Sequence, residues 1–415
     1  MQNVLQESAR REERGLYINR DFLYLLAARS VSLVGDSWYS LAIVWWLYEK
    51  TGTSFALSKF HVANIVPRIV LGMFAGVYID SVSRKRILVG GNVLATAVMV
   101  LTGLLIASPN FSLWHLYVVT AAMSVLVTFM RPADLALIPQ IVSKDGLTKA
   151  TSSTRFSGDL VAVLAPAIGG WLYYATSVQG IIWLNAVSFI GAAFLISLIR
   201  PTPAPLTTTP MSRLIFQGIN LIFWKPIRAL CLLNIALNFF MSAMAVLLAP
   251  FAERHLGAGA LGFGLMITFI TIGSLLGSLI TSLRKSSEGA GRIILTCVIA
   301  AGAGYVLLSF IHELWAALAL LAVMGFAVTT AGVHIDATFL RRLPNEKQGA
   351  FFGAYQSLNS LLRPLSLALL GYGGDALGVG RVFLVGGSVI VLIGLLATRS
   401  RSVLAEETKA PEYGT

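Results

Sequence analysis

The sequence places a single carboxylate, Asp36, deep within an apolar run, in the stretch SVSLVGDSWYSLAIVWW. If that run crosses a membrane, a charge near its centre costs at least about 2.5 to 3.5 kcal/mol, so the residue should face a cavity or a partner. An isolated ionised carboxylate there should either pair with a cation or take up a proton. Alternation between those states is what proton-coupled transport requires, and we predict that role for Asp36. The alternative is a permanent ion pair with Arg68 or Arg363 that only holds helices together.

Two arginines lie near the middle of other apolar runs, and each follows an asparagine by four residues. These pairs are Asn64 with Arg68 and Asn359 with Arg363. Because residues four apart lie on one face of a helix, each pair presents an amide and a guanidinium together. We expect both pairs to line a substrate cavity or its gate, the alternative being a structural role, since asparagines also bridge helices. Four further side chains are expected to line the same cavity: Trp38, Tyr39, Asn234 and Asn238.

Five polar residues lie near the cytoplasmic ends of apolar runs. They are predicted to form a salt-bridge network at an inner gate: Arg131, Asp134, Asp159, His334 and Asp336. A lone histidine inside a membrane could also carry a proton, although it is more often a plain hydrogen-bonding residue. His334 and Asp336 are therefore the second candidates for a coupling site.

The composition explains why these residues stand out. The chain has 415 residues, of which 56% are hydrophobic and 12% charged, whereas about 25% of residues are charged in an ordinary soluble domain. Apolar runs of about 20 residues cross a bilayer as helices, because a helix satisfies its backbone polar groups internally. The two cysteines, Cys231 and Cys297, lie in apolar runs and are expected to be small buried hydrophobes. We therefore expect an all-α membrane protein.

Turn signals divide the chain into twelve apolar segments. They cover residues 22–49, 57–79, 86–107, 113–137, 155–178, 180–199, 228–250, 261–283, 293–311, 314–340, 349–374 and 379–398. Residues 200–227 are rich in Pro and Thr and then amphipathic, as expected of a cytoplasmic linker at the membrane surface. We predict twelve transmembrane helices in two pseudo-symmetric six-helix bundles, 22–199 and 228–398, with tails at 1–21 and 399–415.

The net charge of +12 is unevenly distributed along the chain. Most of the Lys and Arg residues fall in the tails, the linker and alternate loops, which the positive-inside rule assigns to the cytoplasm. Both termini are therefore predicted to be cytoplasmic. Residues 1–21 interleave acids and bases without an apolar core, so we do not expect a cleaved signal peptide. The basic residues indicate topology, and no nucleic-acid partner is expected.

The loop after the second segment, GVYIDSVSRKR, places an acid and three bases in one turn. This stretch resembles the signature of the major facilitator superfamily at that loop, although Ser81 and Ser83 stand where the family most often has Arg and Gly. The matching residues are Gly76, Asp80, Arg84, Lys85 and Arg86. The resemblance implies a gating loop that joins two rocking six-helix halves in the outward-open state. The alternative is that the bases only anchor the loop in the cytoplasm.

Three more stretches resemble the macrolide-efflux branch of that superfamily: TGTSFALS, RPADLALIPQIVSKDGLTKATS and APAIGGWL. The resemblance implies proton-coupled export of amphipathic or macrolide-like drugs by alternating access. It also implies a monomer surrounded by lipid in the cytoplasmic membrane of a bacterium. Siderophore exporters and lysophospholipid transporters share much of this pattern, so their cargoes stay open as alternatives.

Other classes of function lack their motifs in this sequence. No HExxH, GxSxG or CxxC motif occurs, so no enzyme activity, cofactor or metal is expected. There is no GxxxxGK[ST] loop to bind ATP phosphates, so an ion gradient is the expected energy source. A channel is the weaker alternative, because it would need neither a gating loop nor two pseudo-repeated halves.

Overall fold

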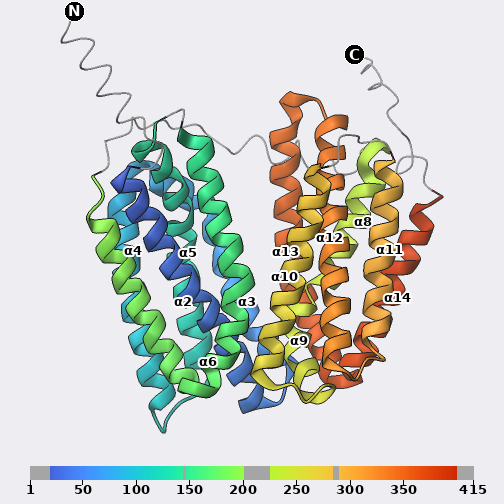
Figure 1. The fold of residues 1–415 in the computed structure, drawn as a ribbon, viewed down its shortest axis with the longest axis horizontal. Coiled ribbons are helices and arrows are strands. Elements are labelled where there is room, and N and C mark those ends of the chain that lie inside the picture. Colours follow the sequence, from blue (N-terminus) through green and yellow to red (C-terminus); the bar gives the residue numbers. More distant parts are fainter. Residues whose placement is uncertain (1–18, 144–145, 201–224, 284–288, 400–415) are drawn as a thin grey trace, which may run out of the picture. The chain divides into compact units, whose positions relative to one another are not determined.

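The computed structural model describes residues 19–143, 146–200, 225–283 and 289–399; the side chains of a few helical stretches, 73–81 among them, lie outside the described part. Within these ranges the chain is helical almost throughout and contains no strand (Figure 1). The helices are α2 (Arg20–Thr51), α3 (Ser54–Ser81), α4 (Arg84–Ala107), α5 (Leu113–Ile141), α6 (Leu147–Ser197), α8 (Lys225–Met241), α9 (Met244–Arg254), α10 (Gly259–Leu283), α11 (Ala290–Leu308), α12 (Leu314–Arg342), α13 (Asn345–Leu377) and α14 (Val379–Ala397).

Helix α6 is broken at Ser177, whose φ of 63° is a value that residues other than glycine seldom adopt. Gly180 lies one turn further along, where a Cβ would lie 2.6 Å from the Cβ of Thr176. A side chain at position 180 would therefore collide with the tight turn. Residues 147–176 and 178–197 form two helices, and the break falls beside the gap predicted between the fifth and sixth segments.

A second break separates α8 from α9 at Ser242 and Ala243. A break inside a membrane frees backbone carbonyls, which must find partners within the protein. The Phe239 carbonyl accepts hydrogen bonds from the Ser242 hydroxyl, at 2.7 Å, and from the Ser366 hydroxyl of α13. The Phe240 carbonyl accepts one from the Tyr305 hydroxyl of α11, at 3.2 Å. The break is thus stabilised by side chains from two other helices.

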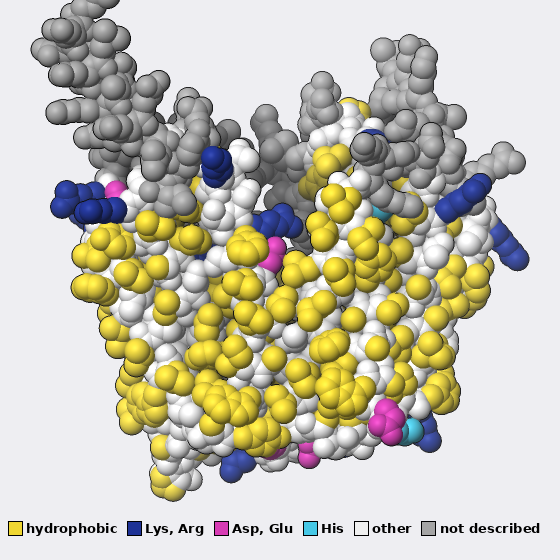
Figure 2. Space-filling view, in the orientation of Figure 1, with side chains coloured by type: hydrophobic (Ala, Val, Ile, Leu, Met, Phe, Trp, Pro, Cys, Tyr) yellow, Lys and Arg dark blue, Asp and Glu magenta, His cyan; other side chains and the backbone are white. Residues whose placement is uncertain are grey.

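Eight helical stretches of the described residues are long and apolar enough to cross a membrane. They are Arg84–Ala107, Leu113–Ile141, Leu147–Ser197, Ile227–Arg254, Gly259–Leu283, Ala290–Leu308, Leu314–Arg342 and Val379–Ala397. Figure 2 shows apolar side chains over the middle of the helices and charged side chains mostly near their ends. The chain is a multi-pass membrane protein, whereas the number of twelve crossings stays a prediction.

The chain divides into two compact units. Unit 1 comprises Met1–Ile43 and Ala63–Thr209, and unit 2 comprises Val44–Val62 and Pro210–Thr415. We call Val44–Val62 the tip hairpin: it contains the end of α2, the short loop and the start of α3. The tip hairpin therefore packs with helices from the second half of the sequence. Helices α2 and α3 each run from one unit into the other.

Apolar residues three apart on α2 form part of the core of unit 1. Phe22, Leu25 and Ala28 are buried, and their spacing places them on one helix face. They belong to the same cluster as Leu137 of α5 and Ile196 of α6. This core joins the first helix of the unit to its last.

Glycines allow close helix packing in unit 2. A Cβ at Gly273 of α10 would collide with the Ala322 carbonyl of α12, and a Cβ at Gly325 of α12 would collide with the Ile270 carbonyl of α10. Small residues at such contacts let van der Waals packing hold helices together in lipid, where no hydrophobic driving force acts between them. Substitution of either glycine would therefore push α10 and α12 apart.

Candidate functional site

Asp36 belongs to a polar cluster inside unit 1, where α2 meets α6. The side-chain amide of the fully buried Asn185 donates a hydrogen bond from Nδ2 to Asp36 Oδ1, at 3.4 Å. The Ser188 hydroxyl lies 2.9 Å from Asn185 Oδ1 and can donate to it, which turns the Asn185 NH₂ group toward Asp36. Among the described residues, the hydrogen bond of Asp36 is therefore made with a neutral amide.

Arg68 of α3 supplies a positive charge near the carboxylate. It contributes a favourable electrostatic interaction with Asp36. Its Nη2 donates to Asn64 Oδ1 at 2.7 Å, and its Nε donates to Ser124 Oγ of α5 at 3.3 Å. The Ser124 hydroxyl donates in turn to the Asn64 carbonyl. The structure brings together Asp36, Asn64 and Arg68 as three predicted site residues, and it adds Ser124.

Gly35 makes room for the amide that faces Asp36. A Cβ at this position would collide with Asn185 Oδ1 and Ser188 Oγ, and would lie 3.0 Å from Ser188 Cβ. Because the Ser188 Cβ is tied to the backbone of α6, α2 could not keep its present position with any larger residue there. The close approach of α2 and α6 thus depends on this glycine.

Replacing Gly35 by alanine should therefore destabilise the protein by about 1 to 3 kcal/mol, as overpacking does in a close-packed core. The matched control is Gly90→Ala in α4, where a Cβ would meet nothing within 4 Å. The measurement is the thermal midpoint of the detergent-solubilised protein, read by size-exclusion chromatography. Equal midpoints for the two variants would contradict this packing account.

Two aromatic side chains beside Asp36 carry buried polar atoms that lack partners. Trp38 Nε1 and Tyr39 OH make no hydrogen bond within the described part of the chain. The Trp38 ring packs against Gly169 of α6, where a Cβ would lie 3.0 Å from Trp38 Cδ1. Tyr39 lies close enough to Asp36 to interact with its charge. Buried donors that lack a partner are costly, and these two groups offer hydrogen-bond donors beside Asp36.

The predicted amides of unit 2 lie on α8, Asn238 one turn and Asn234 two turns before its break. Asn238 Nδ2 donates to the Asn234 carbonyl at 2.9 Å and also contacts Asn234 Oδ1. Asn234 is buried and Asn238 is exposed. Asn238 therefore places a polar side chain on the exposed side of α8, close to the break.

The second predicted amide and guanidinium pair lies on α13 of unit 2. Asn359 Nδ2 donates to the Tyr355 carbonyl of its own helix at 3.0 Å, and Arg363 is exposed. Nε2 of His61, in the tip hairpin, lies 3.0 Å from the Ala245 carbonyl, and His61 interacts electrostatically with Arg363. A carbonyl oxygen only accepts, so Nε2 carries the proton and the hydrogen bond runs from His61 to Ala245.

The predicted gating loop is described only in part. Gly76 and Asp80 lie in α3, and the side chain of Asp80 lies outside the described part of the chain. Lys85 Nζ donates to the Ser197 and Ile199 carbonyls, at 2.7 Å each, at the C-terminal end of α6. A cation is favoured there by the negative end of the helix dipole. Lys85 therefore has a structural partner within unit 1, and Arg84 and Arg86 lie beside it in the first turn of α4.

Asp134, predicted for an inner gate, forms an ion pair with Arg29 of α2. The distance from Arg29 Nη1 to Asp134 Oδ2 is 2.6 Å, and the two side chains are 27% and 19% exposed. Arg131 adds a favourable electrostatic interaction with Asp134. Asp159 lies half-buried on α6. Of the residues predicted in unit 1 for this network, the structure brings together Arg131 and Asp134.

His334 and Asp336 lie on α12 of unit 2. His334 is buried, and its Nδ1 lies 2.9 Å from the Thr330 carbonyl one turn earlier. Asp336 is exposed and interacts electrostatically with Tyr355 of α13. The hydrogen bond of His334 with its own helix is what a plain structural histidine makes.

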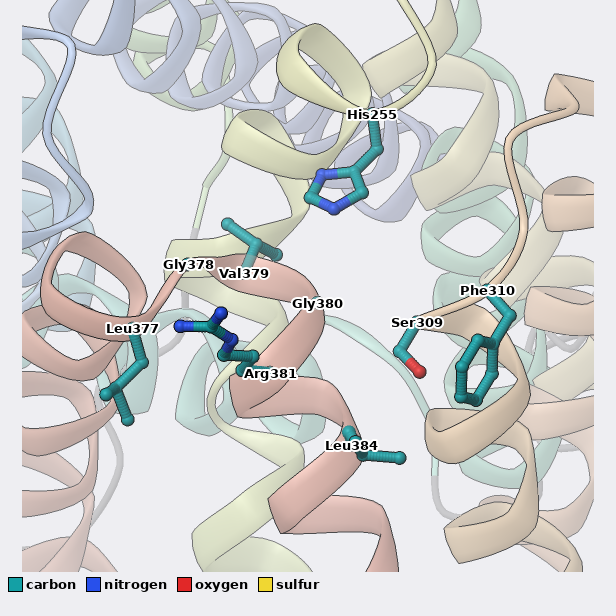
Figure 3. Close-up of a pocket in the computed structure, with 9 residues that line it drawn as sticks. All are labelled: His255, Ser309, Phe310, Leu377, Gly378, Val379, Gly380, Arg381 and Leu384. Atoms are coloured by element: carbon teal, nitrogen blue, oxygen red, sulfur yellow. The ribbon is translucent and has the colours of Figure 1, made fainter.

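An open pocket of about 460 Å³ lies at the end of unit 2 where α14 begins (Figure 3). His255 and Arg381 line it, and the His255 ring stacks on His312 with 6.4 Å between ring centroids. Burial lowers the pKa of His255, and the neighbouring His312 and Arg254 lower that pKa further. The residues that line this pocket include none of those predicted for the transport site.

Apolar helices with polar clusters inside them are what a membrane transport protein requires. The family model of the Major Facilitator Superfamily matches residues 25–367, and the chain belongs to that superfamily of transporters. Macrolide efflux protein A of Streptococcus pyogenes is 22% identical over 382 residues, which cover 90% of this chain and 94% of that protein. The multidrug efflux pump Tap of Mycolicibacterium fortuitum is 23% identical over 389 residues, which cover 90% of this chain and 94% of that protein.

Solved structures agree with this fold. The nucleoside transporter NupG superposes with a TM-score of 0.75 at 9% identity, covering 94% of this chain and 100% of that chain. A bacterial homologue of the iron transporter ferroportin, in an inward-facing state, superposes with a TM-score of 0.70 at 17% identity. The match covers 92% of this chain and 99% of that chain. At such identities the likeness concerns the fold alone.

Proposed function

We propose that the protein exports amphipathic small molecules in exchange for protons by alternating access. The observation that carries the proposal is the cluster of Asp36, Asn185 and Arg68 inside unit 1. A carboxylate within a membrane-spanning helix is costly unless it is paired or protonated. The Asn185 amide suits both forms, because it can donate to the ionised carboxylate and can accept from the protonated one after it turns over. The Arg68 guanidinium favours the ionised form.

The proposed cycle uses these two forms in turn. Asp36 takes up a proton when the cavity faces the acidic outside, which weakens its attraction to Arg68. It loses the proton when the cavity faces the cytoplasm, and the carboxylate again interacts with Arg68 and Asn185. Because each form of the site favours a different set of neighbours, proton binding can shift the balance between the two conformations.

The cargo is proposed from the chemistry of the site and from the relatives. Trp38 and Tyr39 offer apolar rings with hydrogen-bond donors that lack partners among the described residues, and such rings suit amphipathic molecules. The names of the efflux relatives favour drugs such as macrolides. A lysophospholipid or a siderophore would also suit these donors. Survival of a drug-hypersensitive host on macrolides, compared with lysophospholipid uptake by the same cells, distinguishes a drug from a lysophospholipid as the cargo.

We also propose twelve crossings in the cytoplasmic membrane of a bacterium, with both termini cytoplasmic. The break at Ser177 supports two crossings within α6, and α8 with α9 supports one across the break at Ser242. Helices α2, α3 and α13 would supply the remaining crossings, since each is long enough to span a bilayer. The uneven distribution of Lys and Arg supports the orientation.

Cysteine labelling tests this topology. In a protein with Cys231 and Cys297 replaced by serine, Asn110→Cys between α4 and α5 should react with an impermeant maleimide added to intact cells. Ser83→Cys between α3 and α4 should react only after the cells are opened. Both positions are exposed on the protein, so a difference in labelling reports the side of the membrane. The reverse pattern would contradict the proposed orientation.

A further inference from the structure

The first turn of α3 is capped by a carboxylate from the far end of the sequence. Asp375 of α13 accepts hydrogen bonds from the Ser54 N–H at 2.7 Å, through Oδ1, and from the Phe55 N–H at 2.9 Å, through Oδ2. Thr53 Oγ1 accepts from the next amide, Ala56 N–H, at 3.3 Å. The first amides of a helix lack partners within the helix, and the positive end of its dipole favours an anion. Asp375 thus satisfies two amides that the tip hairpin does not satisfy by itself.

The seam between α3 and α13 is close-packed around this cap. A Cβ at Gly371 would collide with the Ser58 hydroxyl, and a Cβ at Gly374 would lie 3.3 Å from the Ser54 Cβ. The Ser58 hydroxyl donates to the Leu367 carbonyl at 2.7 Å, and both side chains are buried. The two glycines, three residues apart, let α13 approach near enough for Asp375 to reach the amides of α3.

Helix α9 also holds the tip hairpin. Arg254 donates to the Gly52 carbonyl, and its guanidinium lies 5.6 Å from the centre of the Tyr48 ring. His61 donates to the Ala245 carbonyl at 3.0 Å. The hairpin is therefore held by polar contacts at separate points along its length, and Asp375 supplies the contact that joins a carboxylate to two backbone donors.

We propose that Asp375 is a gating residue, which latches the tip hairpin to α13 within unit 2 and releases it once in each transport cycle. The proposal rests on the alternating access proposed above. Helices α2 and α3 continue from the tip hairpin into unit 1. The latch therefore couples the end of α2 and the start of α3 to α13. Polar contacts suit a reversible latch, since the α3 amides and the Asp375 carboxylate can both be hydrated on release. Asp375 is already exposed to solvent.

A reversible cross-link tests whether the latch must open. In the protein with Cys231→Ser and Cys297→Ser, the pair Ser54→Cys and Gly374→Cys should oxidise to a disulfide once the Leu247 side chain, 2.4 Å from a Cβ at position 374, has shifted. The Cβ separation of 3.3 Å is just below the roughly 3.5 to 4.5 Å of natural disulfides. Cargo accumulation should be lost on oxidation and regained on reduction, with each single cysteine as the control. Full accumulation by the oxidised pair would overturn the proposal.

Labelling of a buried reporter tests the role of Asp375 without any cargo. Ala56 is buried in the tip hairpin, at 6% exposure, so Ala56→Cys should react slowly with a maleimide in membranes. Asp375→Asn should raise that rate by about threefold to tenfold, as loss of a helix N-cap interaction would. Glu313→Gln, at the N-terminus of α12 where no side-chain cap hydrogen bond forms, should leave the rate unchanged.

An unchanged rate in Asp375→Asn would overturn the latch even if export is demonstrated. A raised rate in a protein that moves no drug would support the latch and reject the export proposal instead. Asn110→Cys, exposed in the loop after α4 and away from the cap, measures the reactivity of an exposed site in each variant, so a general change in the protein is detected separately.

Discussion

Replacement of Asp36 by asparagine is expected to reduce gradient-driven accumulation of cargo to the level of membranes that lack the protein. Asparagine has nearly the shape of protonated aspartic acid and cannot lose a proton. The site would therefore stay in one of its two proposed forms, and the pH gradient would have no group to act on. Downhill exchange of cargo should continue, because the cavity and the helices that form it are unchanged.

Inverted membrane vesicles with an imposed pH gradient provide the measurement. The matched control is Asp21→Asn, which makes the same substitution in the first turn of the same helix. That control should accumulate cargo as the parent does. If Asp36→Asn also accumulates cargo against its gradient, the coupling group lies elsewhere, and His334 with Asp336 is the next place to test.

Breaking the Arg29–Asp134 ion pair is expected to have the largest effect on stability. Removal of one partner of a buried pair costs about 3 to 5 kcal/mol, because the other charge is left without compensation. These side chains are partly exposed, at 27% and 19%, so about 2 to 3 kcal/mol is expected for Arg29→Met or Asp134→Leu. The double variant should regain most of the loss, since it leaves no charge unpaired.

Thermal midpoints of the two single variants, the double variant and the parent form a double-mutant cycle. Arg131→Leu, which removes an exposed arginine near the same carboxylate, should change the midpoint little. Additive losses in the double variant would show that the pair does not stabilise the fold. Losses confined to transport would assign the pair to the gate and not to the structure.

The sequence predicts the course of the helices well, because an apolar run and its turn signals are local. The segment predicted at 314–340 is the helix Leu314–Arg342, and the segment predicted at 293–311 lies within three residues of Ala290–Leu308. The amide and guanidinium of Asn64 and Arg68 could also be paired from the sequence, since a spacing of four is a property of one helix.

The partners of the site could not be predicted, because they come from distant parts of the chain. Asn185 is 149 residues from Asp36, and Asp134 is 105 residues from Arg29. A signal for the first was present, since Asn185 is an amide in the apolar run IIWLNAVSFIGAAF. Nothing in the sequence indicates that this amide faces Asp36 in particular.

Asp375 illustrates a different limit. The composition of its stretch, GYGGDAL, indicates only the end of a helix. The partners of Asp375 are backbone amides, which carry no sequence signal. Lys85 shows the same limit, because the carbonyls of Ser197 and Ile199 are its partners. Contacts to the backbone depend on the arrangement of helices in space, which local patterns do not define.

The coupling of protons to cargo is tested most directly by recording the proton movement itself. The parent protein is placed in liposomes that contain a pH-sensitive dye, with no pH gradient, and a macrolide such as erythromycin is added on one side. Liposomes without protein and liposomes with Asp36→Asn correct for the basicity of the macrolide. The account predicts that entry of the macrolide drives protons out through the parent protein, so the interior becomes more alkaline than in either control. If the macrolide enters the liposomes through the parent protein while the interior pH stays the same as in the controls, proton coupling is contradicted.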